Sequence, residues 1–247
     1  MTGWPVGYGR RVLDEVDSTM QEAARLAGGL ERPEWILARR QTRGRGRRGR
    51  AWTDPEGNFA ATLVMRPDGP AAQVALRSFV AALALHDALA LAVGRTGGLS
   101  LKWPNDVLLN GGKLAGILLE SSGQGGQIGH LAIGIGVNLR DVPGTTEEGA
   151  VRPVSLVGET GVGVDPEEFL DLLAPAYAKW EARFRAGGFA PIREAWLSRA
   201  ARLGEQIVAR TVREEWRGVF ETVDGAGNLV LSTAEGRRAI AAAEVFF

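Results

Sequence analysis

The stretch LSLKWPNDVLLNGGKLAGILLE, residues 99–120, carries the clearest fold signal in the sequence. Asn110, Gly111 and Gly112 separate two apolar segments, and Asn-Gly pairs favour the tight turns that join antiparallel strands. This stretch therefore predicts a β-hairpin. The following apolar segment QIGHLAIGIGVNL, residues 127–139, predicts another strand, so we expect antiparallel neighbours to dominate the sheet.

The segments before the hairpin alternate between strand and helix signals. Apolar runs bounded by turn residues predict strands, whereas polar capping residues followed by helically spaced alanines predict a helix. The predicted strands are EWILARRQ (34–41) and NFAATLVMRP (58–67), and the predicted helices are DSTMQEAARLAGG (17–29) and FVAALALHDALALAVG (79–94). In the helix at 79–94, His86 and Asp87 interrupt the run of apolar residues. The run is too short to span a bilayer, so we interpret this helix as buried.

The C-terminal third changes from a helical to a strand-rich pattern. We expect little regular structure at residues 141–163, followed by a helix in PEEFLDLLAPAYAKWEARFRAGG at 166–188. From about Leu203, short strand-like segments separated by glycine-rich turns, the last of them RRAIAAAEVFF at 237–247, predict a small β-barrel of about fifty residues. The predicted fold class is α+β, with two domains at 1–200 and 201–247.

The composition excludes several classes of protein. The 247 residues include no cysteine, which rules out disulfides, thiolate catalysis and cysteine-based metal sites and is compatible with the cytoplasmic location that we expect. The N-terminal MTGWPVGYGRR has no apolar signal core, so we expect no membrane association. Basic and acidic residues number 29 each, so no broad positive field directs the protein to a polyanion.

The run RGRGRRGR, residues 43–50, is a local exception to this neutral charge. Its glycines permit positive φ and let backbone N–H groups converge on an anion, while the guanidinium groups add forked donors. The loop therefore suits phosphate. The alternatives are a solvated basic loop and an RNA-binding module, although the stretch 39–50 contains no aromatic residue for base stacking.

Two further motifs, KWPNDVLLNGGKLAGIL (102–118) and GIGVNL (134–139), place polar residues and glycines in or near the predicted hairpin. Their candidate residues are Lys102, Asn105, Asp106, Lys113, Gly134, Gly136 and Asn138. Each motif also has a structural interpretation: Trp103 and Pro104 as a packed strand entrance, Lys113 as an exposed turn residue, and the glycines as a bulge.

The motifs DSTMQEA, QTRGRGRRGRAW, KWPNDV, GKLAGIL and IGIGVNL, in this order and at these spacings, closely resemble the biotin protein ligases. The resemblance is strong over residues 14–139 and depends on the strand-and-turn pattern alone in the C-terminal region. It implies a catalytic domain related to class II aminoacyl-tRNA synthetases and lipoate ligases, with a mixed, largely antiparallel sheet, followed by an SH3-like β-barrel. It also implies that biotin and Mg-ATP form biotinyl-5′-AMP, from which biotin passes to a lysine of the biotin carboxyl carrier protein of acetyl-CoA carboxylase.

The resemblance assigns catalytic roles to Lys113, Arg47 and Asp106. Lys113 reaches the biotin carboxylate and the α-phosphate, while Arg47 and Arg45 bind the reacting groups as the arginine loop orders over them. Such cations are needed because a carboxylate and a phosphate repel each other. Asp106 lies beside the reactive carbonyl, where it orients or deprotonates the acceptor lysine, or it braces the hairpin.

The other implied residues bind biotin and ATP. Hydroxyl and amide groups satisfy the ureido ring, glycines allow close backbone approach, and Trp52 and Asn138 lie near adenine. The implied binding residues are Ser18, Thr19, Met20, Gln41, Gly44, Arg45, Gly46, Arg47, Trp52, Asn105, Lys113, Gly116, Gly134 and Asn138. Magnesium is implied together with ATP, and we predict no metal ligands from the protein.

The expected partners are biotin, ATP and the carrier protein, and the expected state is a monomer or a weak homodimer. About a dozen residues precede the DSTMQEA helix, too few for a helix-turn-helix domain, so we expect no DNA recognition. A lipoate-type ligase shares the fold and the adenylate chemistry but not the GRGRRGR and KWPND pair, and it is the alternative function. An RNA-binding module explains only the arginines.

Overall fold

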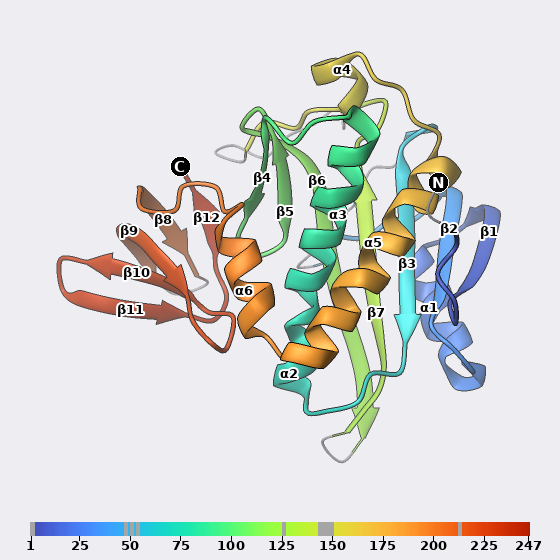
Figure 1. The fold of residues 1–247 in the computed structure, drawn as a ribbon, viewed down its shortest axis with the longest axis horizontal. Helices are drawn as coiled ribbons and strands as arrows, with labels where there is room; N and C mark the ends of the chain where they lie inside the picture. Colours follow the sequence, from blue (N-terminus) through green and yellow to red (C-terminus); the bar gives the residue numbers. More distant parts are fainter. Residues whose placement is uncertain are drawn as a thin grey trace.

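A computed structural model of the protein describes residues 3–46, 49, 52, 55–124, 127–142, 151–211 and 214–247. The described chain forms two β-sheets flanked by helices (Figure 1). The larger sheet has seven strands in the order β1-β2-β3-β7-β6-β5-β4, and the smaller has five in the order β11-β10-β9-β8-β12. The described pairs are antiparallel except for β1 and β2, which confirms a mixed, largely antiparallel α+β fold.

Strands and helices alternate along the first part of the chain, and strands follow one another in the last part. The strands are β1 (Gly9–Val16), β2 (Glu34–Gln41), β3 (Phe59–Met65), β4 (Leu99–Lys102), β5 (Asp106–Leu109), β6 (Gly112–Gln124), β7 (Gln127–Val137), β8 (Gln206–Arg210), β9 (Glu215–Val223), β10 (Leu229–Thr233), β11 (Gly236–Ile240) and β12 (Glu244–Phe246). The helices are α1 (Thr19–Leu26), the short 3-10 helix η1 (Ala27–Gly29), α2 (Ala71–Ala75), α3 (Arg77–Val93), α4 (Leu156–Thr160), α5 (Pro166–Gly187) and α6 (Ala190–Leu197).

The β5–β6 hairpin forms where the sequence predicts it. Asn110 and Gly111 have φ angles of 50° and 79°, and positive φ at both central residues is what a type I′ hairpin turn requires. The two strands then pair so that Asp106 lies opposite Gly116. The hairpin thereby brings a carboxylate next to the glycine-containing strands β6 and β7.

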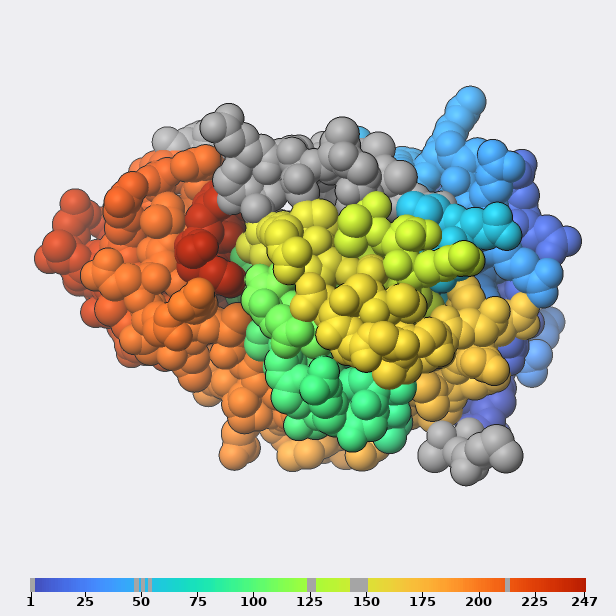
Figure 2. All heavy atoms as spheres, turned by 90° about the horizontal axis from the view of Figure 1, so that it is seen from above, coloured from blue at the N-terminus to red at the C-terminus, as the bar shows by residue number. Residues whose placement is uncertain are grey.

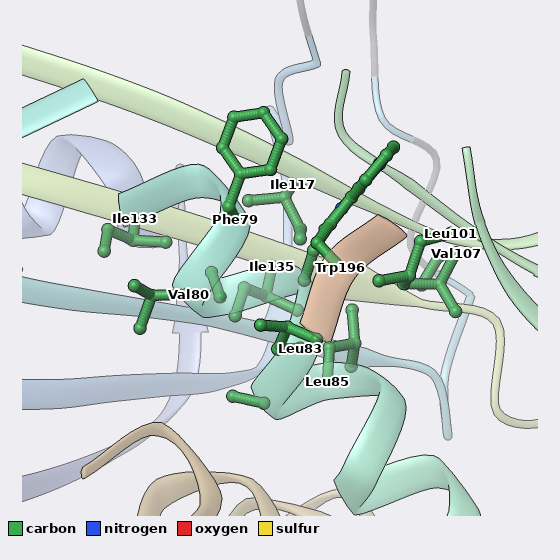
Figure 3. Close-up of a cluster of buried hydrophobic side chains, with 14 of the residues drawn as sticks. Phe79, Val80, Leu83, Leu85, Leu101, Val107, Ile117, Ile133, Ile135 and Trp196 are labelled. Carbon is green, nitrogen blue, oxygen red and sulfur yellow. The ribbon is translucent and has the colours of Figure 1, made fainter. Parts of the chain in front are cut away.

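The main hydrophobic core lies between the large sheet and the helices α3, α5 and α6. Figure 3 shows Val80 and Leu83 of α3 in one cluster with Ile133 and Ile135 of β7 and with Trp196 of α6. These residues come from elements distant in sequence. Burial of this apolar surface therefore holds the helices on the sheet.

The predicted buried helix is part of a longer run. Residues Ala71–Val93, which include α2 and α3, form a run of 23 residues that is long and apolar enough to cross a bilayer, so the argument from length was wrong. Within the described chain, however, 72% of its most apolar window is buried inside the protein. Burial identifies this run as a core helix.

The opposite face of the large sheet carries α1 and a smaller apolar cluster. The members of that cluster are Met20, Ala23, Leu30, Ile36, Val64 and Ala132. Successive residues of a strand point to opposite faces, so Ile133 and Ile135 enter the main core while Gly134 and Gly136 lie on the side of α1. The faces of β7 therefore differ sharply in side-chain volume.

The smaller sheet corresponds to the predicted C-terminal strands. In the described chain its outer strands β11 and β12 are not paired with each other, so the sheet is open and not the closed barrel that we expected. The segment RRAIAAAEVFF, which we predicted as one strand-like piece, divides into β11 and β12 because the last strand crosses to the other edge and pairs with β8.

Strand β1 and the helices α2, α4 and α6 were absent from the sequence prediction. Strand β1 has many polar side chains and forms by parallel pairing with β2. Helix α4 lies in the stretch that we expected to be irregular, and it is capped by Ser155 and by Gly161 with φ of 73°. Helix α6 follows closely after α5. Residues 143–150 of the expected irregular stretch lie outside the described residues.

Candidate active site

A group of hydroxyl and amide side chains lies where α1 meets β2 and β3. Ser18 caps α1, and its hydroxyl accepts from the Met20 backbone N–H at 3.3 Å. The backbone N–H and the hydroxyl of Thr19 donate to Gln41 Oε1 at 2.9 and 3.1 Å. Thr62 of β3 donates to the Thr19 hydroxyl at 2.8 Å. Because Ser18, Thr19 and Thr62 are buried, the cluster offers desolvated polar groups of the kind that a ureido ring requires.

Met20 lies against Gly134 of β7. A Cβ atom at position 134 would be only 2.7 Å from Met20 Sδ, so this approach depends on glycine. The strand neighbours of Gly134 are Thr62 on β3 and Leu118 on β6. The surface between α1 and the sheet is therefore polar at Thr19 and apolar at Met20.

The arginine loop leaves β2 beside this cluster. The Arg43 backbone N–H donates to the Asp17 carbonyl at 2.7 Å, and the Gly44 carbonyl accepts from the Trp52 N–H at 3.0 Å. Gly49 has φ of 74°, as expected for a glycine that turns the loop, whereas Gly44 does not have positive φ. Gly44 is needed for a different reason, because a Cβ atom there would be 2.6 Å from the Trp52 carbonyl oxygen.

The side chain of Arg45 contacts α1. Its guanidinium donates to the Gln21 amide oxygen, while the Gln21 amide nitrogen donates to Asp17 Oδ2 at 2.9 Å. Arg25 also binds the Asp17 carboxylate, with one contact at 3.0 Å, and this hydrogen bond lowers the pKa of Asp17. With the Gln21 amide oriented in this way, it links Arg45 of the loop to Asp17, whose carboxylate is paired with Arg25.

The Trp52 indole lies against glycines of β6 and β7. A Cβ atom at Gly136 would be 2.4 Å from Trp52 Cε2, and one at Gly116 would be 3.4 Å from Trp52 Cζ3. Gly116 and Gly136 are direct partners in the sheet. A side chain at position 136 would displace the indole, so the position of Trp52 depends on Gly136.

Asp106 lies between two lysines. Lys113 Nζ is 2.8 Å from Asp106 Oδ1, and Lys102 Nζ is 3.7 Å from Asp106 Oδ2. The Lys113 ammonium group is the ion-pair partner of Oδ1, and beyond it Oδ1 has no hydrogen-bond donor among the described groups. Asp106 and Lys102 are buried, whereas the Lys113 side chain is 34% exposed. A buried carboxylate oxygen is thus available to an incoming donor beside an accessible ammonium group.

The two predicted asparagines brace neighbouring segments. Asn105 Nδ2 donates to the Ile117 carbonyl at 2.6 Å and the Ile117 N–H donates to the Asn105 carbonyl at 2.9 Å, which ties the β4–β5 turn to β6. Asn138 Nδ2 donates to the Val154 carbonyl at 3.1 Å, beyond the end of β7. These contacts are structural, so direct contact with a ligand stays a prediction for both residues.

Contacts connect several of the predicted residues into one series. They run from Thr19 through Gln41 and Gly44 to Trp52, and Trp52 lies against Gly116. The series continues to Asp106, which is the strand partner of Gly116, and then to its lysine neighbours. Segments between residues 19 and 116 of the sequence are therefore neighbours in space.

The sequence prediction differs from the described site at a few positions. It did not assign roles to Thr62, Gly136 or Lys102, although a lone hydroxyl in the apolar run FAATLVM was a usable signal for Thr62. Gly46 is half-buried in the arginine loop. The predicted catalytic residue Arg47 lies outside the described residues.

Two protein-family descriptions match the chain. The Biotin/lipoate A/B protein ligase family matches residues 12–138, which include the β5–β6 hairpin and the contacts described above except Asn138 with Val154. The Biotin protein ligase C terminal domain matches residues 203–247, which contain the five-stranded sheet. Together the matches account for both sheets.

Individual relatives agree with the family matches. The chain is 61% identical over 238 residues to the biotin--[acetyl-CoA-carboxylase] ligase of Paracoccus denitrificans, covering 96% of this chain and 99% of that relative. It is 32% identical to a bifunctional ligase/repressor of Bacillus subtilis, covering 94% of this chain and 72% of the relative. The solved structure of the biotin protein ligase from Aquifex aeolicus in complex with biotin and ATP has a TM-score of 0.81 at 28% identity, covering 96% of this chain and 98% of that one. The chain belongs to the biotin protein ligases of the biotin/lipoate A/B protein ligase family.

Proposed function

We propose that this protein activates biotin with ATP to biotinyl-5′-AMP and transfers the biotinyl group to a lysine of the biotin carboxyl carrier protein. The Paracoccus relative is named for the ligation of biotin to acetyl-CoA carboxylase, and the Aquifex structure contains biotin and ATP. The observation that carries the proposal is the continuous series of contacts in the site. It sets hydroxyl groups suited to a ureido ring, an indole suited to a purine, and the Asp106–Lys113 pair along one series.

The first step joins two anions. An oxygen of the biotin carboxylate attacks the α-phosphorus of ATP, and the bond from that phosphorus to the bridging oxygen breaks as pyrophosphate leaves. Lys113 supplies a positive charge for both reactants, because its ammonium group is accessible and its stem is fixed by β6. Arg45 supplies a second cation once it leaves Gln21, and we assign Arg47 the role of retaining the adenylate.

The second step transfers the acyl group. The amine of the carrier lysine attacks the acyl carbon, and the bond from that carbon to the phosphate oxygen breaks as AMP leaves. The attacking amine must give up a proton and must be oriented. Asp106 Oδ1 suits this task because it is buried, has no hydrogen-bond donor among the described groups beyond its ion pair with Lys113, and so lies beside the cation that we place at the reacting phosphate.

Magnesium enters in this proposal as part of the Mg-ATP substrate. Among the described residues, no three His, Asp or Glu side chains are grouped to hold a metal ion. Mg²⁺ commonly binds phosphate oxygens and water with only one or two protein carboxylates, so Mg-ATP does not need a preformed protein cage. Chelation by EDTA should stop pyrophosphate formation while biotin binding, measured by calorimetry, persists.

The direct test uses the whole chain with biotin, Mg-ATP and a carrier domain, and measures the intact mass of the carrier. We expect the mass of one biotinyl group to appear only when all components are present. Replacing biotin by lipoate tests the alternative. Faster labelling with lipoate than with biotin would establish the lipoate-type function, and no labelling with either would refute the proposal.

Asp106→Asn tests the division of labour between the two steps. We expect pyrophosphate formation to stay near the wild-type rate, because Lys113 remains, while transfer from preformed adenylate slows about a hundredfold. Asp68→Asn, at an exposed position, is the control. Equal slowing of both steps by Asp106→Asn would show that Asp106 only braces the hairpin.

The organisation of the chain completes the proposal. We assign residues 1–200 to a catalytic domain and residues 201–247 to an SH3-like C-terminal domain, supported by the family match that begins at residue 203 and by the start of β8 at Gln206. A cytoplasmic location and a monomer or weak homodimer remain predictions.

A further inference from the structure

The turn between β4 and β5 leads directly into Asp106, the first residue of β5, and is attached to the C-terminal sheet. The indole N–H of Trp103 donates to the Gly227 carbonyl, in the β9–β10 turn, at 3.0 Å. Trp103 is 3% exposed and Gly227 is half-buried, so this hydrogen bond lies partly inside the protein. Trp103 lies three residues before Asp106, and Lys102 is the strand partner of Asp106. A displacement of Trp103 is therefore transmitted to the carboxylate over a very short length of chain.

The β9–β10 turn is a rigid partner for this bond. Asp224 Oδ1 accepts from the backbone N–H groups of Ala226 and Asn228, both at 2.9 Å. Gly227 has φ of 84°, and a Cβ atom there would lie 2.9 Å from Leu76 Cδ2. Both the local hydrogen bonds and the packing against the α2–α3 region therefore fix the carbonyl that Trp103 binds.

Further contacts hold strand β4, which precedes the turn that contains Trp103. The Leu101 N–H donates to the Arg199 carbonyl, and the Leu101 carbonyl accepts from the Ala201 N–H, both at 2.8 Å. The ammonium group of Lys102 lies 5.9 Å from the ring centre of Phe247, the last residue of the chain. Figure 2 shows the red C-terminal end beside the green part of the chain. The strand and the turn before Asp106 thus contact the C-terminal region at several independent points.

We propose that Trp103 is a positioning residue, through which the C-terminal domain holds Asp106 in place for transfer of the biotinyl group to the carrier lysine. This inference depends on the function proposed above. Asn105 ties the other end of the turn to β6, so the turn is held between the two sheets. The C-terminal sheet thereby contributes to the second chemical step without touching the reacting atoms.

Trp103→Phe tests the inference because phenylalanine keeps an aromatic ring but lacks the N–H donor. The matched control is Trp180→Phe. Trp180 is 5% exposed and donates one indole hydrogen bond, to Asp87 Oδ2 at 2.9 Å, on the helical side of the sheet. For both variants we would measure the unfolding midpoint, single-turnover pyrophosphate release, and transfer from preformed biotinyl-AMP to the carrier domain.

The expected result is selective. Trp103→Phe should lower the transfer rate constant at saturating carrier about tenfold, equivalent to about 1.4 kcal/mol, while the KM for carrier and the rate of pyrophosphate release change less than about twofold. Trp180→Phe should lower stability but not transfer. Gly227→Ala, which displaces the acceptor carbonyl and leaves Trp103 intact, should reproduce the selective loss.

Three results would overturn the inference. The first is wild-type transfer by Trp103→Phe, and the second is an equal loss of transfer in Trp180→Phe. The third is equal slowing of both chemical steps in Trp103→Phe. If the wild-type chain itself releases pyrophosphate but labels no carrier, or does neither, then the proposed function fails together with this inference.

Discussion

The two faces of the seven-stranded sheet are formed by alternate residues of the same strands, but they differ in what those residues supply. Toward the helices, β7 presents Ile133 and Ile135, which pack in the main core. Toward α1, the same strand presents Gly134 and Gly136, which lie against Met20 and Trp52. One face is filled by its own large side chains, whereas the other lacks them and admits side chains from elsewhere. The alternation of isoleucine and glycine along β7 thus supplies side chains for the core on one face and leaves space for Met20 and Trp52 on the other.

Buried charges show the same contrast. Between α3 and α5, the Arg77 guanidinium makes three hydrogen bonds of 2.8 to 3.2 Å to the Glu181 carboxylate. On the site side, Asp106 has two ammonium groups nearby, yet its Oδ1 has no hydrogen-bond donor among the described residues. The first pair is complete within the protein and fixes two helices. The second retains hydrogen-bonding capacity, which is what a substrate needs.

The largest expected effect is on the helical side. Glu181→Ala leaves the Arg77 charge buried without its partner, and we expect the free energy of unfolding to fall by about 3–5 kcal/mol. The biotinylation rate per folded molecule should not change. Glu205→Ala removes the exposed pair with Arg202 at 2.7 Å and should cost less than about 1 kcal/mol. Urea unfolding of both variants checks this order, and a similar cost for the two would contradict it.

On the site side, Lys113→Ala should reverse this pattern. Removing this ammonium group leaves Lys102 as the remaining cation beside the buried Asp106, so stability should fall by less than in Glu181→Ala, but about 3 kcal/mol of transition-state stabilisation should be lost, about a hundredfold in the rate of pyrophosphate release. Lys179→Ala, an exposed lysine on α5, is the control for charge. A loss below about fivefold would show that the loop arginines, and not Lys113, supply the decisive charge.

The sequence predicted the fold where the local signal and the tertiary structure agree. The Asn110-Gly111 turn is such a case, because its conformation is set by the residues themselves. Strand β1 was missed because its polar residues give no apolar alternation, and it becomes a strand only through pairing with β2. The division of the last segment into β11 and β12 was missed for a related reason, since the pairing of β12 with β8 is a long-range contact.

The site was predictable residue by residue but not as a set of contacts. Motif order and spacing identified Asp106 and Lys113, and the resemblance supplied their roles. No sequence pattern shows that the Trp52 indole needs Gly136 to be a glycine, because the two residues meet only after β7 and the arginine loop are folded. The attachment of Trp103 to Gly227 is likewise a contact across 124 positions of sequence.

Gly136→Ala tests whether the absence of a side chain at position 136 is what allows the Trp52 indole to lie against β7. The new methyl group would lie 2.4 Å from Trp52 Cε2, so the indole must move. If Trp52 borders the adenine, the KM for ATP should rise about tenfold, about 1.4 kcal/mol, with little change in biotin binding. In a Trp52→Leu background the same substitution should be nearly neutral, and a double-mutant cycle measures this coupling. Gly28→Ala is the control, since a Cβ atom there has no neighbour within 4 Å.

The smallest expected effect concerns Tyr8, whose electrostatic neighbours Glu181, Arg185 and Arg77 belong to α5 and α3. Burial, reinforced by the negative charge of Glu181, raises the pKa of Tyr8 to about 12 from 10.0. A raised phenol pKa favours the protonated folded state, so its contribution is fully present below pH 10 and is lost as the pH rises from about 10 to 12.

Because Tyr8 is only half-buried, solvent screening should reduce this contribution to about 1 kcal/mol or less. Tyr8→Phe removes the ionisable phenol, so the stability of the variant should fall less steeply than that of the wild type above pH 10. Tyr177 is present in both proteins and its pKa is raised chiefly by burial, with the charge of Tyr8 a smaller cause, so most of its alkaline titration cancels in the difference. Urea midpoints measured from pH 8 to 11.5 give that difference directly. Parallel curves would mean that the Tyr8 phenol ionises as it does in the unfolded chain, and that the helical side is less shielded from water than its buried Arg77–Glu181 pair indicates.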